Sequence, residues 1–517
     1  MDRSGGFFPR IERKSNMRHT KIAHASPLEG APRLNLPSEY GASPNKEIIF
    51  RISATGRRPI TFRIEGLPEG LSLKEGIIRG RVEKEGSYPL RIEAENALGK
   101  AEKNVTLQIF PGSLLLTPLM GFSSWNAFGF EVTQEDMERT AQQLLSTGIA
   151  EYGYRYVNVD SGWQAGYGGE FDATQPDPEK FTDMKLFCRR LHDKGLLCGI
   201  YSSPMLVPYG CDMNHEPRPT GTTQGEPDPV WSEERGGIGT VRKEKNNALQ
   251  WADWGFDYLK YDWRPCDPYN ADQMKRALLE TDRDFGFCVT VRAYDLYHAY
   301  WEKNCTSYRC GPDSHGMWHY LLKSYRSYFD FIPYVKKGHF FDMDMLDIGD
   351  CTMLKKRDGN NFRYRAYTED EQIVAFSYRA FFASPLQISC RLESLSEFET
   401  DLFCNEEILE IHQDALFSPA LPHLIREVNG GCVHVWKRLL ENGDQAIAVF
   451  NLGETEEKIT VYLEKRFRIR DAWEKKDLSE GNQFSLFTYP HTARIFRLKE
   501  MPSVKGRLAQ KAQIDEK

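Results

Sequence analysis

The sequence lacks long apolar runs, metal-type cysteine spacing and a surplus of basic residues. None of its 517 residues lies in a stretch close to the roughly 18 apolar residues that span a bilayer. The 11 cysteines form no CxxC pattern and no Cys/His zinc spacing. The formal net charge of -7 provides no positive field for nucleic acid. These absences argue against a membrane-spanning protein, a zinc-finger protein and a nucleic-acid-binding protein.

Motifs for common cofactors are also missing. No GxGxxG motif follows an expected strand, so no dinucleotide is implied. No His-Glu-x-x-His pair stands at a strand end, which argues against a zinc hydrolase. The run DMDMLDIGD (342–350) could pass for a calcium or magnesium loop, but it lacks the EF-hand pattern of Gly and Glu. A catalytic metal is the weaker hypothesis, and we expect no cofactor.

The N-terminus and the cysteines bear on the cellular compartment. The first 20 residues contain no apolar core of the signal-peptide type. Cys198, Cys288 and Cys390 lie within apolar, strand-like runs, where thiols usually act as small hydrophobic groups. We expect mostly free cysteines, with room for one or two disulfides.

The composition changes along the chain, and its length predicts several domains. Residues 1–31 are polar and patternless, which predicts a flexible tail. Residues 32–112 contain short alternating runs between turn signals, which predicts an all-β sandwich. Residues 413–500 are β-rich again and predict a second sandwich, and residues 501–517 form a polar tail.

Residues 32–112 also resemble a known kind of module. The pattern GLPEGLSL…GIIRGRV…GSYPLRIEAENALG is similar to the immunoglobulin-like modules of secreted bacterial enzymes. The segment contains no acid/base cluster, so we interpret it as a spacer or a binding module.

Between residues 113 and 412 strand-like and helical patterns alternate, which predicts a (β/α)8 barrel. A doubly wound sheet is the alternative on strand count alone. The helix in TQEDMERTAQQLLSTG is expected to begin at a threonine cap followed by acids. The expected strands cover residues 119–125, 155–160, 196–202, 257–262, 287–293, 306–310, 339–344 and 384–390.

Active sites of such barrels lie at the carboxyl ends of the strands. In YLKYDWRPCD (258–267), Lys260 and Asp262 are two residues apart and therefore share one face of a strand. A single Asp at a strand end is more often a helix cap. Several acids converging with two cations indicate a functional site instead. The residues at these ends are Trp125, Asp160, Tyr201, Lys260, Asp262, Arg292, Arg309 followed by Asp313, Asp342 and Asp344.

Paired carboxylates surrounded by aromatic residues are typical of glycoside hydrolysis. Aromatic residues make up 12% of this chain, and their flat faces suit sugar rings, although large cores use them too. The motifs TPLMGFSSWNAFG, YRYVNVDSGWQ, CGIYSS, YLKYDW, YRCGPDSHGMW, DMDMLDIG, SPLQIS and ILEIHQD stand in order between residues 116 and 420. In this order and spacing the chain resembles glycoside hydrolase family 27, the family of α-galactosidases and α-N-acetylgalactosaminidases.

The resemblance implies roles for individual residues. Asp262 would be the nucleophile and Asp313 the acid/base that follows Arg309 by four residues. Lys260 would hydrogen-bond the sugar and Trp125 would stack on its ring. The remaining implied substrate contacts are Asp160, Tyr201, Arg309 and Asp344, with Trp318 matching a tryptophan downstream of the acid/base.

Two departures from the family pattern bear on the sugar. Ser161 replaces an aspartate that reads the C4–C6 side of the sugar, and a serine binds more weakly there. Ala293 stands where the family has a glutamate that reads the 2-hydroxyl, which is compatible with a 2-acetamido sugar. Leu296, however, matches the bulky galactosidase residue, and Arg292 or Asp295 could substitute for the glutamate.

A third departure concerns a disulfide. Arg264 replaces the cysteine two residues after the nucleophile, so that the family's usual disulfide is missing. Cys211 with Cys266 is a conceivable replacement. Arg264 itself could meet an acidic or highly hydroxylated substrate, although a surface ion pair is the simpler interpretation.

The sequence therefore predicts a retaining, exo-acting hydrolase of terminal α-linked galactose or a close relative. The long segment 202–240 would narrow the pocket over a terminal sugar. The alternatives are another sugar (α-N-acetylgalactosamine, an α-glucosyl unit or β-L-arabinopyranose) and a sugar-binding protein on an inactive barrel. The expected partner is an oligosaccharide or glycoconjugate, with a homodimer left open. The N-terminal module favours secretion or the periplasm, and the visible N-terminus leaves the cytoplasm open.

Overall fold

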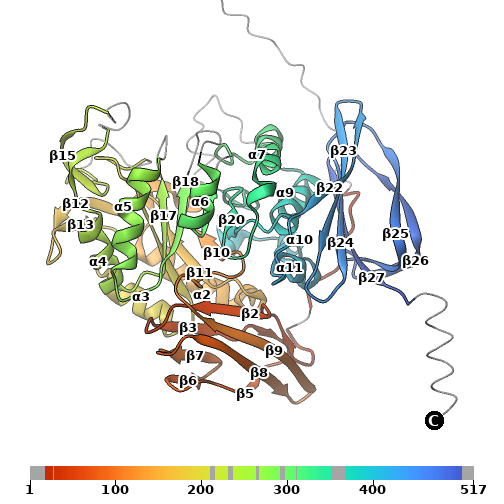
Figure 1. Ribbon diagram of the computed structural model, residues 1–517, viewed down its shortest axis with the longest axis horizontal. Helices are drawn as coiled ribbons and strands as arrows, with labels where there is room; N and C mark the ends of the chain where they lie inside the picture. Colours follow the sequence, from red (N-terminus) through yellow and green to blue (C-terminus); the bar gives the residue numbers. More distant parts are fainter. Residues whose placement is uncertain are drawn as a thin grey trace, which may run out of the picture.

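Three β-containing units make up the protein (Figure 1). The computed structural model describes residues 18–26, 28–209, 216–230, 237–262, 267–290, 297–309, 311–351 and 367–502. In Figure 1 the N-terminal unit lies beneath the central α/β unit, and the C-terminal unit lies at its side. Among the described residues no helix is long and apolar enough to cross a membrane.

The N-terminal unit consists of two main sheets around its own apolar core. One sheet has the order β2-β9-β8-β5 and the other the order β3-β7-β6, while β1 pairs with β4. Its core includes Phe50, Ile92 and Val105, from strands of both sheets. The strands are β1 (Arg33–Leu34), β2 (Glu39–Ala42), β3 (Ile48–Arg51), β4 (Ala54–Thr55), β5 (Thr61–Glu65), β6 (Leu71–Lys74), β7 (Ile77–Gly80), β8 (Gly86–Asn96) and β9 (Gly99–Ile109). This layered β unit agrees with the predicted sandwich only in outline.

The central unit is a curled parallel sheet of eight strands in the order β20-β19-β18-β17-β14-β11-β10-β21. Its two edges approach at a parallel bridge between Leu346 and Ile388. The strands are β10 (Met120–Ser123), β11 (Tyr156–Val159), β14 (Leu197–Ser202), β17 (Tyr258–Asp262), β18 (Gly286–Thr290), β19 (Ser307–Arg309), β20 (Phe340–Phe341) and β21 (Leu386–Ile388). All eight strands expected from the sequence lie in this sheet, which confirms the barrel-like arrangement over the doubly wound alternative.

Helices connect these strands and cover the outside of the sheet (Figure 1). The expected capping box is present at α2, where Thr133 and Asp136 exchange hydrogen bonds. The helices are α1 (Trp125–Phe128), α2 (Gln134–Ser146), α3 (Met184–His192), α4 (Glu244–Trp254), α5 (Pro268–Leu279), α6 (His298–Asn304), α7 (Trp318–Phe331), α9 (Glu369–Phe381), α10 (Glu397–Phe403) and α11 (Glu406–His412). Short 3-10 turns are η1 (Gly129–Glu131), η2 (Ile149–Tyr152), η3 (Ile332–Tyr334) and η4 (Leu392–Ser394). Two hairpins extend the loops: β12 (Gln164–Gly168) with β13 (Ala173–Pro176), and β15 (Thr223–Pro227) with β16 (Gly239–Arg242).

The C-terminal unit is an antiparallel β-sandwich that shares part of its core with the barrel helices. Its strand order is β22-β23-β24-β27-β25-β26. Trp473 donates to Ser377 Oγ of α9 at 3.2 Å, and Trp436 packs in one core cluster with Phe382. The strands are β22 (Leu421–Val428), β23 (Gly431–Leu439), β24 (Gln445–Asn451), β25 (Glu457–Asp471), β26 (Lys476–Thr488) and β27 (Thr492–Glu500).

A buried chain of ion pairs joins the N-terminal unit to the base of the barrel. Arg283 contacts Glu47 of the N-terminal unit at 2.7 Å and Asp257 of the barrel at 2.6 Å. Asp257 also accepts from His192 at 2.8 Å. Burial raises the pKa of Asp257, but the charges of Arg283 and His192 outweigh it and lower that pKa to about 2. The acid is therefore ionised, and the two units are held together by paired charges.

Residues 18–26 differ from the flexible tail that the sequence predicts for residues 1–31. Asp370, in the first turn of α9, accepts from the backbone of Thr20 at 2.9 Å and from His19. Asp401 of α10 accepts from the backbone of Ala25 at 2.8 Å. The partners of this polar stretch lie some 350 to 377 residues away in the sequence. No local sequence pattern therefore predicts that it is ordered.

Most of the described cysteines are unpaired, as expected. Cys188, Cys198, Cys288, Cys305, Cys390, Cys404 and Cys432 are free thiols, and all of these but Cys432 are buried. Cys211 and Cys266, the conceivable replacement pair, lie outside the described residues.

Candidate active site

Lys260 and Asp262 lie at the carboxyl end of β17 and face two neighbouring strands. The Nζ atom of Lys260 donates to Asp160 Oδ2 at 2.8 Å, just beyond the end of β11. The hydroxyl of Tyr201 on β14 donates to Asp262 Oδ2 at 3.1 Å. Strand alternation places both charged side chains on one face, and each finds a partner on that face. The pair from the YLKYD strand therefore joins three adjacent strand ends.

Asp160 is the fixed partner of the Lys260 ammonium group. Its carboxylate accepts from Ser123 Oγ at 3.3 Å, and its backbone N–H donates to Ser124 Oγ at 2.9 Å. Asp160 is only 3% exposed. Burial would lower the pKa of Lys260, but nearby carboxylates, led by Asp160 and Asp262, raise it well above its usual value. Lys260 is therefore charged.

Arg309 binds two carboxylates at the end of β19. Its Nη2 atom contacts Asp313 Oδ1 at 2.8 Å, and its Nη1 atom contacts Asp344 Oδ2 at 2.9 Å. Burial would lower the pKa of Arg309, yet the surrounding acids raise it well above its ordinary value, Asp344 most and then Asp313 and Asp262. Because Lys260 also feels Asp262 and Asp344, the two cations and the acids belong to one charge network.

Asp344 reaches this network through an unusual backbone conformation. The sequence predicts Asp342 and Asp344 on one face of a strand, but β20 ends at Phe341 and Asp344 has φ +67°. Arg379, inside α9, donates to the carbonyls of residues 343, 344 and 345 and fixes this turn. The prediction from alternation is wrong here, because a buried arginine in a distant helix sets the backbone.

The carboxyl groups of Asp342 and Asp344 have pKa values shifted in opposite directions. Burial, followed by the charge of Asp344, raises the pKa of Asp342. Burial also raises the pKa of Asp344, but Arg309 and then Lys260 outweigh it and lower that pKa. The backbone N–H of Asp344 donates to Asp342 Oδ1 at 2.8 Å. Asp344 is therefore the ionised member that faces the cations.

The other residues predicted from the sequence are placed as follows. Ser161 donates to the carbonyl of Tyr209. Trp125 is the first residue of α1, directly after the end of β10. Trp318 begins α7, and its ring stacks on His491 of the C-terminal sandwich with a centroid separation of 4.0 Å. Ala293, with Arg292, Asp295, Leu296 and Arg264, lies outside the described residues.

The acidic run 342–350 supplies acceptors for distinct partners. Asp342 accepts from the backbone of Asp344, and Asp344 pairs with Arg309. Asp347 accepts from Gly316 N at 2.8 Å and from the Ser314 hydroxyl. The carboxylates of Asp342, Asp344 and Asp347 thus bind protein donors at different places, whereas a calcium loop would turn its acids toward one point.

Sequence reasoning missed Arg379 and Ser314. Arg379 reads as an ordinary polar position of a helix, although it is 1% exposed. The backbone N–H of Ser314 donates to Asp344 Oδ2 at 2.7 Å, which anchors the residue next to Asp313. A charged residue within the apolar run IVAFSYRAFFA was the one available signal for Arg379.

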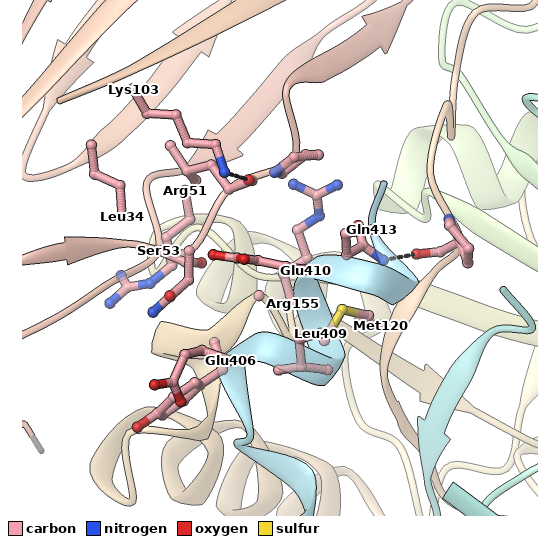
Figure 2. A pocket seen from close by; sticks show the side chains of 16 residues that line it. Leu34, Arg51, Ser53, Lys103, Met120, Arg155, Glu406, Leu409, Glu410 and Gln413 are labelled. Carbon is pink, nitrogen blue, oxygen red and sulfur yellow. Dashed lines mark hydrogen bonds between the residues drawn. The ribbon is translucent and has the colours of Figure 1, made fainter. Parts of the chain in front are cut away.

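A separate cavity lies at the opposite end of the barrel (Figure 2). Lys103 of β9, Arg155 just before β11 and Glu410 of α11 are among the residues that line it. Side-chain hydrogen bonds between lining residues run from Lys103 to the Leu36 carbonyl at 2.5 Å and from Gln413 to the Pro118 carbonyl at 2.9 Å. Its volume of about 40 Å³ holds only a few water molecules. This seam between two units is thus unsuited to a sugar ring.

The carboxyl ends of the barrel strands and the loops that follow them, here called the rim, contain the groups required for acid/base and nucleophilic chemistry. Asp262 is held by a tyrosine hydroxyl and lies near a charged lysine. Asp313 is held by a buried arginine. Carboxylates with distinct partners can take different roles in one reaction. The arrangement is suited to splitting a bond between an electrophilic carbon and a leaving oxygen.

Comparisons with known proteins agree with this chemistry. The family model described as Alpha galactosidase A matches residues 117–208, and the Alpha galactosidase C-terminal beta sandwich domain matches residues 430–498. The "Probable alpha-galactosidase" of Dictyostelium discoideum is 26% identical over 387 residues, which cover 72% of this chain and 89% of the relative.

Solved structures extend the comparison to the fold. A "putative alpha-galactosidase/melibiase" from Bacteroides fragilis NCTC 9343 has a TM-score of 0.80 at 27% identity and covers 91% of this chain and 98% of its own. A family 27 β-L-arabinopyranosidase from Geobacillus stearothermophilus has a TM-score of 0.64 at 22% identity and covers 75% and 97%. Together these matches support the resemblance to glycoside hydrolase family 27 and indicate that the chain is a glycoside hydrolase.

Proposed function

We propose that the protein is a retaining, exo-acting glycoside hydrolase that removes a terminal α-linked galactose or a close relative. The observation that carries the proposal is the single charge network of Lys260 and Asp262 at the end of β17 with Arg309 at the end of β19 and Asp313 in the loop that follows. Curated α-galactosidase relatives support the same class of reaction.

The proposed reaction proceeds by two displacements. The Asp262 carboxylate attacks the anomeric carbon while Asp313 gives its proton to the departing glycosidic oxygen. The bond to the leaving group breaks as the glycosyl–Asp262 ester forms. Asp313, now ionised, takes a proton from water, and this water attacks the anomeric carbon and releases Asp262. The sugar leaves with its original configuration.

Each neighbouring group supports one of these roles. The Tyr201 hydroxyl, 3.1 Å from Asp262 Oδ2, orients the nucleophile. Lys260 shares the strand end with Asp262, and its charge interacts with that carboxylate. Arg309 fixes the position of Asp313 through the 2.8 Å contact. Asp160 and Asp344 would read sugar hydroxyls, and Trp125 would stack on the apolar face of the ring.

The identity of the sugar is the finer part of the proposal. Ser161 stands where an acidic residue would read the C4–C6 side, and Ala293 stands where a glutamate would read the 2-hydroxyl. The side chains of Ser161 and Ala293 are smaller than the acidic residues they replace and bind a sugar less strongly. They are therefore also compatible with α-N-acetylgalactosamine, an α-glucosyl unit or β-L-arabinopyranose. The arabinopyranosidase neighbour makes the last of these a specific competitor.

The rest of the chain has supporting roles in the proposal. The segment 202–240 would close over a terminal sugar and restrict cleavage to chain ends. The N-terminal β unit would be an immunoglobulin-like spacer or binding module, and its presence favours a secreted or periplasmic enzyme. The substrate would be an oligosaccharide or glycoconjugate, and a homodimer is compatible with the proposal.

A panel of 4-nitrophenyl glycosides tests the proposed function. The panel contains α-galactoside, α-N-acetylgalactosaminide, α-glucoside, β-L-arabinopyranoside and β-galactoside. We expect the highest kcat/KM on the α-galactoside and no hydrolysis of the β-galactoside. The variants Asp262→Asn and Asp313→Asn serve as matched controls, and each should lose nearly all turnover. A higher kcat/KM on another member would replace the sugar and keep the reaction. A protein that binds galactosides but hydrolyses no member of the panel would be the sugar-binding alternative.

A further inference from the structure

Asp347 connects two parts of the rim that come from distant segments of the chain. Its Oδ2 atom accepts from the backbone of Gly316 at 2.8 Å and from the hydroxyl of Ser314. Its Oδ1 atom accepts from the side-chain amide of Asn126. Ser314 follows Asp313, and Asn126 follows Trp125 in α1. One carboxylate therefore ties the loop of the proposed acid/base to the helix of the proposed stacking residue.

The surroundings of Asp347 are unusual for a carboxylate that serves only packing. Asp347 is 2% exposed and Asn126 is 1% exposed. Among the residues that the structure describes, Asp347 has no ion-pair partner within 4.0 Å. Three donors from two segments converge on it instead. Burying a carboxylate without a paired cation is unfavourable. An apolar residue would avoid this cost, but it could not form the hydrogen bonds that join the two segments.

Two further contacts hold the loop that carries Asp313. Arg309 binds the Asp313 carboxylate itself, and Asp344 accepts from the Ser314 backbone at 2.7 Å. Both anchors hold the loop to the β19–β20 side of the barrel. Asp347 connects the same loop to α1, beyond the end of β10, through its hydrogen bond with Asn126.

We propose that Asp347 is a positioning residue that fixes Asp313 relative to Trp125 and so sets the acid/base at the height of the glycosidic oxygen. The inference rests on the proposed function, because it assigns Asp313 the acid/base role. A proton donor must lie within hydrogen-bond reach of the leaving oxygen, and general acid catalysis contributes about 10²- to 10⁴-fold. Loosening the loop should remove part of that factor.

The expected effect depends on the leaving group. A 2,4-dinitrophenolate leaves without help from a proton, whereas the oxygen of an alkyl glycoside or disaccharide needs the proton of Asp313. Asp347→Ala should therefore lower kcat/KM on the alkyl glycoside at least about 10-fold more than on the dinitrophenyl glycoside, as expected for a partial loss of general acid catalysis. A merely structural role would lower both by the same factor.

An exchange variant provides the rescue. In the double variant Asn126→Asp/Asp347→Asn, the amide introduced at position 347 donates to the carboxylate introduced at position 126. The remaining oxygen of that amide still accepts from Ser314 and Gly316. This variant should recover most of the kcat/KM on the alkyl glycoside that Asp347→Ala loses. As a matched control, Asp471→Ala removes an equally buried carboxylate from the C-terminal sandwich and should affect both substrates alike.

The outcomes separate the inference from the proposed function. If wild-type protein hydrolyses neither substrate class for any sugar of the panel, both the proposed function and the role of Asp347 fail. If wild type is active but Asp347→Ala lowers kcat/KM equally on both substrates, or the exchange variant recovers no kcat/KM on the alkyl glycoside, the Asp347 inference alone is overturned. Should Asp347→Ala not fold, Ser314→Ala and Asn126→Ala each remove one donor and must show the same selective loss, reduced in size.

Discussion

Replacing Asp347 by asparagine should reduce the loss of stability that the wild-type protein undergoes as the pH rises from 4 to 7. Burial raises the pKa of Asp347 to about 6, and the charge of Asp344 adds to this, against the opposing hydrogen bond of Ser314 and the charge of Arg379. Tyr367 also faces this carboxylate, and its own pKa is raised mainly by burial and then by Asp347. Because the ordinary value for a free aspartate is about 3.8, the folded protein holds this proton more tightly than the unfolded chain.

The sign and size of the effect follow from proton linkage. A group with a raised folded-state pKa contributes fully to stability below the unfolded value, and that contribution is lost as the pH rises through the folded value. Between pH 4 and 7 the loss amounts to about 3 kcal/mol, since about two pH units correspond to about 1.4 kcal/mol each. Asp347→Asn carries no charge and escapes this loss.

Melting temperatures of wild type and Asp347→Asn, measured in parallel from pH 4 to pH 8, test this reasoning. The melting temperature of the variant minus that of wild type should be lowest near pH 4 and should rise by several degrees by pH 7, the size expected for about 3 kcal/mol in a barrel of this length. All other titrating groups are the same in both proteins, so their contribution to the pH dependence cancels in the difference between the two melting temperatures. A difference that stays constant with pH, or that shrinks as the pH rises, would refute the assignment of a raised pKa to Asp347.

Three further changes have defined outcomes. Tyr201→Phe removes the hydroxyl that lies 3.1 Å from Asp262 and should lower kcat/KM roughly 10- to 100-fold, since a hydrogen bond to a charged group contributes about 1.5–3 kcal/mol; an unchanged kcat/KM would be inconsistent with this contact. Arg309→Met leaves the buried Asp344 and the partly exposed Asp313 without their cation and should destabilise the protein by about 3–5 kcal/mol in denaturant titration; wild-type stability would speak against the ion pairs. Arg283→Met, at the base of the barrel, should lower the melting temperature and leave kcat/KM near the wild-type value; a large loss of activity would contradict the separation of this ion-pair chain from the rim.

Much of the barrel was predictable because its signals are local. Each barrel strand is a short apolar run followed by a polar residue, and helical periodicity fills the intervals. The position of Lys260 beside Asp262 on one face also follows from alternation alone. The approach of the two sheet edges at Leu346 and Ile388 could not be derived, since it depends on the accumulated twist of all the strands.

The features that escaped prediction depend on contacts between distant segments. Asp344 departs from strand alternation because Arg379, 35 residues further along, binds the carbonyls around it. Asp347 contacts Ser314, 33 residues earlier, and Asn126, 221 residues earlier. Residues 18–20 are ordered by an acid about 350 residues away. A single sequence contains no periodicity that couples such positions.

Mechanism-based trapping tests the central claim most directly. A 5-fluoro-α-galactosyl fluoride, or the corresponding fluoride of the preferred sugar, should accumulate as a covalent ester on the protein because its hydrolysis is slowed. Peptide mapping by mass spectrometry should place one glycosyl group on the peptide that contains Asp262, and Asp262→Asn should carry none. A glycosyl group on a different carboxylate, or an active enzyme that releases product of inverted configuration without any adduct, would contradict the account.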